Sequence, residues 1–310
     1  MIDPVIGLTW HEELGDDAAR LHELLLAARA EDGRPDVVQG EPLPSEFRAG
    51  WHLLAKDRGV LVGYAHLDPV GDSSGRQIGE LFVHPAHRGH GFGRALLRAL
   101  IDRAIPGDEF AGEDEDTPER LRIWSHVDHP AAARLAQRCR LRRVRELLRM
   151  RLEFAASPAL PEPRWRDGVQ VRTFVPSQDE DAVIEVNRRA FSWHPEQGGL
   201  TVEELAATEA QPWFDPEGFF LAVDEHDLVL GFHWTKVHPE GDGEVYVVGV
   251  DPDAQGGGLG KALILAGLRY LHDRDVDRVI LYVEADNTPA VAMYSGLGFR
   301  LWDVGVQYGK

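Results

Sequence analysis

In the sequence VVGVDPDAQGGGLG at residues 247–260, a strand-forming run ends at a proline and passes through glycines into a helical pattern. The proline ends strand pairing, and glycine has no Cβ atom, so successive backbone N–H groups can come close to an anion. The helix that follows adds unpaired N–H groups and the positive end of its dipole. The stretch therefore predicts a loop that cradles a diphosphate.

A second copy of this pattern lies in the first half of the chain, where residues 80–93 read ELFVHPAHRGHGFG. Both copies contain Val-x-Pro, then Arg or Gln, and then Gly-x-Gly before a helix. One constant separation pairs Val83 with Val250, Pro85 with Pro252, Arg88 with Gln255, Gly91 with Gly258 and Gly93 with Gly260. Self-similarity over a domain-sized period indicates that the chain is a duplication.

The length of the chain agrees with two domains. With 310 residues it is long for one compact domain and sufficient for two. Residues 155–168 begin with small residues and prolines, which is typical of a linker. We therefore expect one domain at residues 1–154, a linker at 155–168 and a second domain at 169–310.

The spacing of apolar residues predicts the same order of elements in both halves. In the second half we expect strands at 169–174, 219–223, 229–237, 244–250, 279–284 and 299–308, and helices at 179–191, from 201, at 260–272 and at 289–297. In the first half we expect helices at 16–30 and 91–104, and strands at 51–55, 59–67, 121–125 and 142–154. This order predicts an α+β or α/β fold, in which helices flank a mixed, mostly antiparallel sheet in each half.

Composition excludes several classes of protein. The net charge of −19 argues against a nucleic-acid or anionic-membrane binder, because phosphate affinity depends on clustered Lys and Arg. No apolar run approaches the roughly 20 residues that span a bilayer, and no secretory signal is visible. The single cysteine, Cys139, cannot form an intrachain disulfide. A single cysteine is typical of a cytoplasmic protein, and we expect that location. We also expect a monomer, since the duplication already supplies a pseudo-dimer.

The paired loops resemble the acetyl-CoA-binding motif of the GCN5-related N-acetyltransferase (GNAT) superfamily, and the resemblance covers most of both halves. It implies that the strand before each loop splays from its neighbour, so that acetyl-CoA lies in the gap with its diphosphate on the loop. The implied acetyl-CoA contacts are Leu81, Phe82, Val83, Gly89, His90, Gly91, Phe92, Gly93 and Arg94 in the first half, and Val248, Gly249, Val250, Gln255, Gly256, Gly257, Gly258, Leu259, Gly260, Lys261, Asn287, Thr288, Pro289, Ala290, Val291 and Ala292 in the second.

The second loop departs from the family pattern in its charge. It carries Gly256 and Gly257 where relatives often carry basic residues. Binding through the backbone should survive this change, but we expect a weaker positive field than the one around Arg88 and Arg94 in the first loop.

The second half contains the acid that the family reaction uses. Residues 287–294 read NTPAVAMY, and with the SGLGF that follows they resemble the family's second CoA-contact motif, in which a tyrosine protonates the departing thiolate. Pro130 in the first half matches Pro289, which places Leu135 where the second half has Tyr294. Leucine has no proton to donate. We therefore expect Tyr294 to be the general acid and the first half to be non-catalytic, with acetyl-CoA bound there at most structurally.

A carboxylate near the second loop points the same way. Glu244 lies six residues before Val250 on the predicted strand, and it is the candidate general base that takes the proton of the acceptor amine. The same count in the first half reaches Gln77, which cannot act as a base. Glu80 is close by, but its odd separation from Val83 puts it on the other face of a regular strand. A bulge would change that parity, and a surface acid at the start of a strand stays an alternative for Glu244.

The segments HPEQGG at 194–199, WFDP at 213–216, GFHWTKVHP at 231–239 and LYVE at 281–284 resemble the mycothiol synthase family of actinobacteria, whose members are themselves tandem acetyltransferases. This resemblance implies transfer of acetyl from acetyl-CoA to the cysteinyl amine of cysteinyl-glucosaminyl-inositol, which forms mycothiol. The implied acceptor contacts are Glu41, Glu196, Lys236, Glu244 and Tyr282, and Glu244 would act as a base through a water.

Other activities stay open at this stage. His84, His87 and His90 are evenly spaced, but no carboxylate or cysteine completes a ligand set, so we expect no metal. The same fold could acetylate another amine, such as an aminoglycoside, a polyamine or a protein N-terminus, because a fold does not fix its acceptor. A non-catalytic module that senses acyl-CoA is an alternative from a different class.

Overall fold

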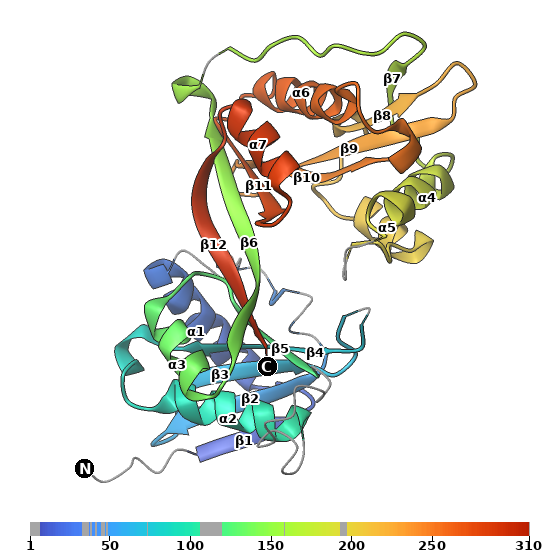
Figure 1. Ribbon diagram of the computed structural model, residues 1–310. Coiled ribbons are helices and arrows are strands. Elements are labelled where there is room, and N and C mark those ends of the chain that lie inside the picture. The colour runs from blue at the N-terminus through green and yellow to red at the C-terminus, as the bar shows by residue number, and fades with distance from the viewer. Residues whose placement is uncertain are drawn as a thin grey trace. The chain divides into compact units, whose positions relative to one another are not determined.

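The chain forms two compact units in the computed structural model (Figure 1). The first unit contains residues 1–147 and 303–310, and the second contains residues 148–302. The structure describes residues 7–32, 37, 39–40, 42–44, 47, 49–72, 74–105, 120–157, 159–192 and 197–309. Each unit contains one of the two glycine loops, as the repeat predicts.

The first unit is a mixed sheet with a helix layer on each face. Its elements are β1 (Gly7–His11), α1 (Asp17–Asp32), β2 (Trp51–Asp57), β3 (Val60–Asp68), β4 (Gln77–Val83), α2 (Phe92–Ala104), β5 (Leu121–Ser125), α3 (Pro130–Arg138) and the beginning of β6 (Arg142–Glu153). The strand order is β1-β2-β3-β4-β5, and β4 and β5 run parallel. Helix α1 packs Leu25 against Leu54, whereas α2 packs Leu96 against Leu53 on the opposite face.

The second unit repeats this arrangement. Its elements are the end of β6, then β7 (Gln170–Thr173), α4 (Glu180–Ala190), α5 (Val202–Glu209), β8 (Phe219–Val223), β9 (Val229–Val237), β10 (Gly243–Val250), α6 (Leu259–His272), β11 (Arg278–Glu284), α7 (Thr288–Gly296) and the beginning of β12 (Arg300–Gly309). The strand order is β6-β11-β10-β9-β8-β7, and β10 and β11 run parallel. Helices α4 and α5 pack on the face that carries Phe232 and Trp234, and α6 packs on the other.

Most predicted elements are confirmed within two residues, and so is the mostly antiparallel sheet. The capping box at Thr201 and Glu204 starts α5 as expected. The prediction missed β1, a short strand with exposed residues, and it treated α3 only as the counterpart of α7. Among the described residues, no helix is both long and apolar enough to cross a membrane.

The carboxyl-terminal strand departs from the predicted domain ranges. Residues 303–310 belong to the first unit, although the sequence assigned 169–310 to the second. In the structure, Val306 pairs antiparallel with Ser125 of β5 and Tyr308 pairs with Ile123. Val306 and Tyr308 are buried in the core of the first unit. The alternation of apolar residues predicts a strand but does not say which sheet edge the strand completes, so the exchange was not visible in the sequence.

This exchange gives a stability prediction. Replacing Val306 with Asp buries an unpaired charge in the first unit, so we expect the free energy of unfolding of that unit to fall by roughly 3 kcal/mol or more. Amide hydrogen exchange should quicken throughout β5. Leu301→Asp is the control, because Leu301 lies on the same strand and is 58% exposed. Equal exchange in the two variants would contradict the assignment of residues 303–310 to the first unit.

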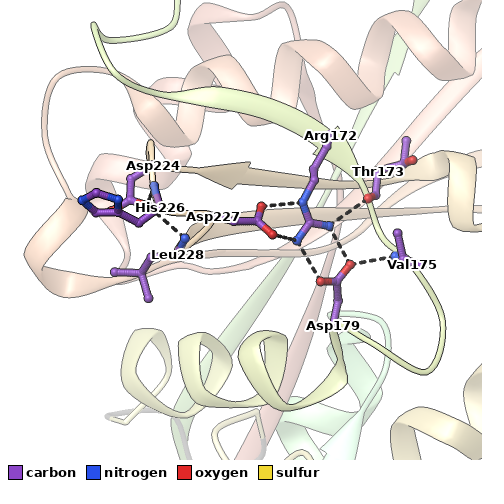
Figure 2. A network of polar contacts seen from close by, with 8 residues as sticks. All are labelled: Arg172, Thr173, Val175, Asp179, Asp224, His226, Asp227 and Leu228. Atoms are coloured by element: carbon purple, nitrogen blue, oxygen red, sulfur yellow. Dashed lines mark hydrogen bonds and ion pairs between the residues drawn. The ribbon is translucent and has the colours of Figure 1, made fainter.

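A polar network fixes the edge of the second unit beside α4 (Figure 2). The Arg172 guanidinium donates to both carboxylate oxygens of Asp179, at 2.6 and 2.8 Å, and to Asp227 at 2.9 Å. The hydrogen bond from Arg172 lowers the pKa of Asp179. Because Asp179 directly precedes α4, the network attaches this helix to β7 and to the hairpin between β8 and β9.

A buried histidine predicts how stability depends on pH. His233 lies on β9, where its Nδ1–H donates to the Leu263 carbonyl at 2.8 Å and its Nε2 has no partner among the residues that the structure describes. Burial lowers the pKa of His233 from 6.5 to about 4. Between these two values the unfolded chain binds a proton that the folded chain does not. The free energy of unfolding should therefore decrease as the pH is lowered through this window, by at most about 1.4 kcal/mol per pH unit.

Urea unfolding at several pH values between about 4 and 7 measures this effect against the His233→Asn variant. The wild type should show the steeper loss of stability on acidification, because the variant has no group to protonate at this position. Parallel pH curves for the two proteins would contradict the depressed pKa of His233.

Candidate active site

The two glycine loops share positive φ values at two corresponding positions and differ at the position between them, where Gly257 has a φ of 59° and His90 does not have a positive φ. In the second unit, Gly256 and Gly258 have φ values of 84° and 84°, and the first unit has Gly89 and Gly91 at 79° and 92°. L-residues rarely adopt this region, so glycine is needed there. Among the described residues, a Cβ at any of these four positions would meet nothing within 4 Å, so sterically there is room at these positions and the backbone conformation is what requires glycine. Gly91 and Gly258 then serve as the N-caps of α2 and α6.

Both strands that lead into the loops separate from their parallel neighbours, as the resemblance implies. The parallel pairing of β10 with β11 covers Gly243 and Glu244 and then ends, so the last six residues of β10 border a gap. In the first unit, the pairing of β4 with β5 ends at Glu80. Backbone groups along such a gap are available to a ligand, because no strand partner uses them.

The gap of the first unit opens into a cavity of about 520 Å³. Leu135 of α3, which the sequence matches to Tyr294, lines this cavity. The predicted acyl-CoA contacts that line this cavity are Leu81, Phe82, Val83, Gly89, Gly91, Phe92, Gly93 and Arg94. His90 is exposed beside it, and its Nδ1 lies 3.3 Å from the carbonyl oxygen of His87.

Glu244 lies at the point where the gap of the second unit begins. It is 7% exposed, and its Oε2 accepts a hydrogen bond from Nε2 of His238 at 2.6 Å. A register shift between Val245 and Val247 makes a bulge at Tyr246. Glu244 is the direct partner of Lys236 on β9, so the two side chains lie on the same face of the sheet.

Lys236 lies against aromatic rings on this face. Its Nζ is 4.7 Å from the ring centre of Trp213 and 5.3 Å from that of Tyr246. Trp213, Trp234 and Tyr246 pack together with ring centres 5.2–5.7 Å apart. Burial, and next the charge of Glu244, raise the pKa of Tyr246, so that this phenol stays neutral. The structure thus brings two predicted acceptor contacts, Lys236 and Glu244, into one polar and aromatic surface.

The other predicted acceptor contacts are placed in part. Tyr282 lies two residues beyond Ile280, the β11 partner of Glu244, and therefore on the same face of the sheet. The guanidinium carbon of Arg149 is 6.0 Å from the ring centre of Tyr282. Glu41 and Glu196 lie outside the described residues.

Tyr294 comes to the gap from the opposite face. It lies on α7 and packs into the core that includes Val245, Val283 and Phe299. Burial raises its pKa to about 12, so the hydroxyl keeps its proton at neutral pH. Among the described residues, none makes a hydrogen bond with this hydroxyl. Asn287 caps the same helix by accepting from the backbone N–H of Ala290.

The counterparts in the first unit differ in chemistry. The pairing of β4 with β3 runs from Val83 to Ile78 without a shift. Counted along β3 and β9, the first-unit residue that corresponds to Glu244 is therefore Ile78. The sequence count gave Gln77 because it could not include the bulge of β10. Neither residue can accept a proton. Glu80 is buried and accepts a hydrogen bond from His126 at 2.6 Å, and it lies two residue pairs closer to the loop than Ile78.

The sequence did not single out His238 or Tyr246. The predicted turn at residues 241–243 could have pointed to His238. A tight turn there pairs Gly243 with Val237, and this brings His238 close to Glu244. The bulge at Tyr246 had no signal. Within the described residues, no group of three or more His, Cys, Asp or Glu side chains could hold a metal ion.

Comparison with known proteins identifies the family. The profile of the acetyltransferase (GNAT) family matches residues 20–139 and 182–299. A mycothiol acetyltransferase of Amycolatopsis mediterranei is 53% identical over 97% of this chain and 98% of its own. A mycothiol acetyltransferase of Saccharomonospora viridis is 54% identical, over 98% and 99% of the two chains.

Solved structures agree on the fold. A GCN5-related N-acetyltransferase from Sphaerobacter thermophilus matches with a TM-score of 0.72 at 25% identity, over 98% of this chain and 95% of that chain. A tandem GNAT protein from the clavulanic acid biosynthesis pathway matches with a TM-score of 0.69 at 20% identity, over 98% of both chains.

These matches confirm the prediction of two tandem acetyltransferase domains. Enzymes of this family take the acyl group from an acyl-CoA. With two profile matches and near-complete relatives above 50% identity, the chain belongs to the GNAT acetyltransferase family and, within it, to the mycothiol acetyltransferases.

Proposed function

We propose that the chain transfers acetyl from acetyl-CoA to the cysteinyl amine of cysteinyl-glucosaminyl-inositol, and that the second unit performs the reaction. The observation that carries this proposal is the position of Glu244, a buried carboxylate at the start of the gap between β10 and β11. The names of the close relatives support the acceptor. The proposal includes a monomer, because the duplication already supplies a pseudo-dimer.

Glu244 is the general base in this proposal. Through a water, it takes a proton from the acceptor ammonium, and the free amine then attacks the thioester carbonyl. His238 donates to the same carboxylate and fixes its orientation. Lys236 and Tyr282 share this face and offer polar contacts to a polyhydroxylated acceptor, together with Glu41 and Glu196 from the predicted set.

Backbone N–H groups near Val250 stabilise the oxyanion that forms when the C–N bond is made. As the oxyanion collapses, the C–S bond breaks, the amide nitrogen releases its extra proton to water, and Tyr294 gives its proton to the departing thiolate. The base and the acid act from opposite faces of the gap, which separates the acceptor from the leaving group.

The first unit is proposed to bind acetyl-CoA without turning it over. Its loop and its cavity of about 520 Å³ support binding. Leu135 supplies no acid, and Ile78 and Gln77 supply no base.

The test follows CoA release by the purified chain supplied with acetyl-CoA and cysteinyl-glucosaminyl-inositol, and identifies the product by mass. Glucosaminyl-inositol without the cysteinyl group is the matched control, and we expect no acetylation of it. Turnover of another amine, with none of the cysteinyl acceptor, would remove the proposed acceptor while leaving the acetyltransferase assignment intact.

A further inference from the structure

The second glycine loop has a cation beside it that comes from elsewhere in the chain. Arg166 belongs to the segment at 155–168 that the sequence predicts as a linker. In the structure its Cδ atom lies 2.7 Å from where a Cβ on Gly257 would be, so the arginine occupies the space that a side chain of the loop would fill. His90 stands at the corresponding position of the first loop.

Several contacts hold Arg166 in this place. Its Nη2 donates to the carbonyl oxygen of Ala254, just before the loop, at 2.8 Å. Its own carbonyl accepts from the N–H of Val169 at 3.1 Å. The neighbouring Trp165 packs against the buried cluster that contains Ala254 and Leu259. The linker is therefore fastened to both ends of the loop.

Arg166 keeps its charge available. No carboxylate among the described residues pairs with it, and its buried Nε has no acceptor. The two acids that precede the loop pair with another arginine, since Arg189 lies 3.1 Å from Asp251 and 2.7 Å from Asp253. A guanidinium has five N–H donors, and Arg166 uses one of them on Ala254.

In the first loop, the arginine is part of the loop and is already paired. Arg88 belongs to the loop itself, but Asp32 holds it with two hydrogen bonds of 2.8 and 2.6 Å. Gln255 stands at the equivalent position of the second loop, and its amide reaches the Val250 carbonyl just as Arg88 reaches that of Val83. The first loop thus has a neutralised arginine, whereas the second has an unneutralised one supplied by the linker.

We propose that Arg166 binds the diphosphate of the acyl donor at the second loop and replaces the basic residues that the loop lacks. Gly257 lies between the N–H groups of the loop and the start of α6, where an anion is attracted by both. Guanidinium binds phosphate oxygens in a fixed, forked geometry, and hydrogen bonds between charged groups are the strong ones. This proposal rests on the proposed use of acyl-CoA by the second unit.

The first experiment measures CoA affinity by calorimetry in a Gly89→Asp background, which puts a carboxylate into the first loop and leaves one site to observe. Arg166→Gln should weaken CoA and 3′-dephospho-CoA alike, by roughly tenfold or more, because both carry the diphosphate. S-acetylpantetheine has no diphosphate, and its kcat/KM as a donor should stay unchanged. Arg164→Gln, on the same segment and exposed, is the matched control.

A second variant tests the position of the charge. Arg166→Ala combined with Gly257→Arg returns the cation to the loop itself, and we expect it to recover at least part of the lost affinity. Unchanged CoA binding by Arg166→Gln would overturn the inference, as would an equal loss with S-acetylpantetheine or a loss confined to the 3′-phosphate. No CoA binding by the background protein would instead contradict the proposed function of the second unit.

Discussion

Replacing Tyr294 with phenylalanine is expected to lower kcat by roughly 10²- to 10⁴-fold, the range that a positioned general acid contributes. The substitution removes one oxygen atom and keeps the ring that packs against Phe299 at 5.7 Å. The folded structure should therefore survive, and KM for acetyl-CoA should change little. Rapid-quench and steady-state measurements of CoA release separate the chemical step from binding.

The raised pKa of Tyr294 sharpens this expectation. With a pKa of about 12 the phenol keeps its proton at neutral pH, so wild-type kcat should not fall between about pH 8 and 10 because of this group. In the variant, breaking the C–S bond releases an unprotonated thiolate, and this raises the barrier of that step. An acetyl donor with a more acidic thiol should recover part of the lost rate.

Tyr270→Phe is the matched control, since it removes another partly buried phenol of the same unit. The Tyr270 hydroxyl donates to Asp215 at 2.5 Å, and Tyr270 lies on α6 away from the loop. We expect kcat to stay within about twofold of wild type, because this tyrosine touches no reacting atom. If both variants lose the same activity, Tyr294 acts through stability and not as an acid.

The sequence was sufficient for the glycine loops, because their conformation depends on local residue types. Gly256 and Gly258 need positive φ values that only glycine adopts freely, and the proline before the loop fixes where the strand ends. Tyr294 could be found in the same way, since Pro289 sets the register of its helix.

Features that depend on pairing between distant segments were not readable. The exchange of residues 303–310 into the first unit is a choice between sheet edges, and the alternation of apolar residues alone cannot decide it. The bulge at Tyr246 is of the same kind, because it exists only relative to β9. Arg166 belongs to a segment that reads as a linker, and only its packing against Ala254 reveals its place beside the loop.

Replacing Glu244 with glutamine should also lower kcat by roughly 10²- to 10⁴-fold at neutral pH, because the amide cannot take the proton of the acceptor ammonium. Glutamine has the same shape, and its amide can still bond to His238. The deficit should shrink as pH rises above about 8, where an α-amine loses its proton to solvent without help from a base. A pH profile of kcat/KM for the acceptor measures this convergence.

The first unit offers a matched control for Glu244. Glu80 is a carboxylate of similar burial, 9% against 7% exposed, and it contacts a histidine at the same distance of 2.6 Å. Glu80→Gln thus repeats the chemical change in the unit that lacks the tyrosine, and turnover should stay within about twofold of wild type. If Glu80→Gln lowered kcat as far as Glu244→Gln does, catalysis would belong to both units, and the loss of the tyrosine at Leu135 would no longer separate them. If only Glu244→Gln loses activity and regains it at high pH, burial and a histidine contact do not by themselves make a carboxylate catalytic. The decisive feature is then the position of Glu244, beside Lys236 at the start of the gap.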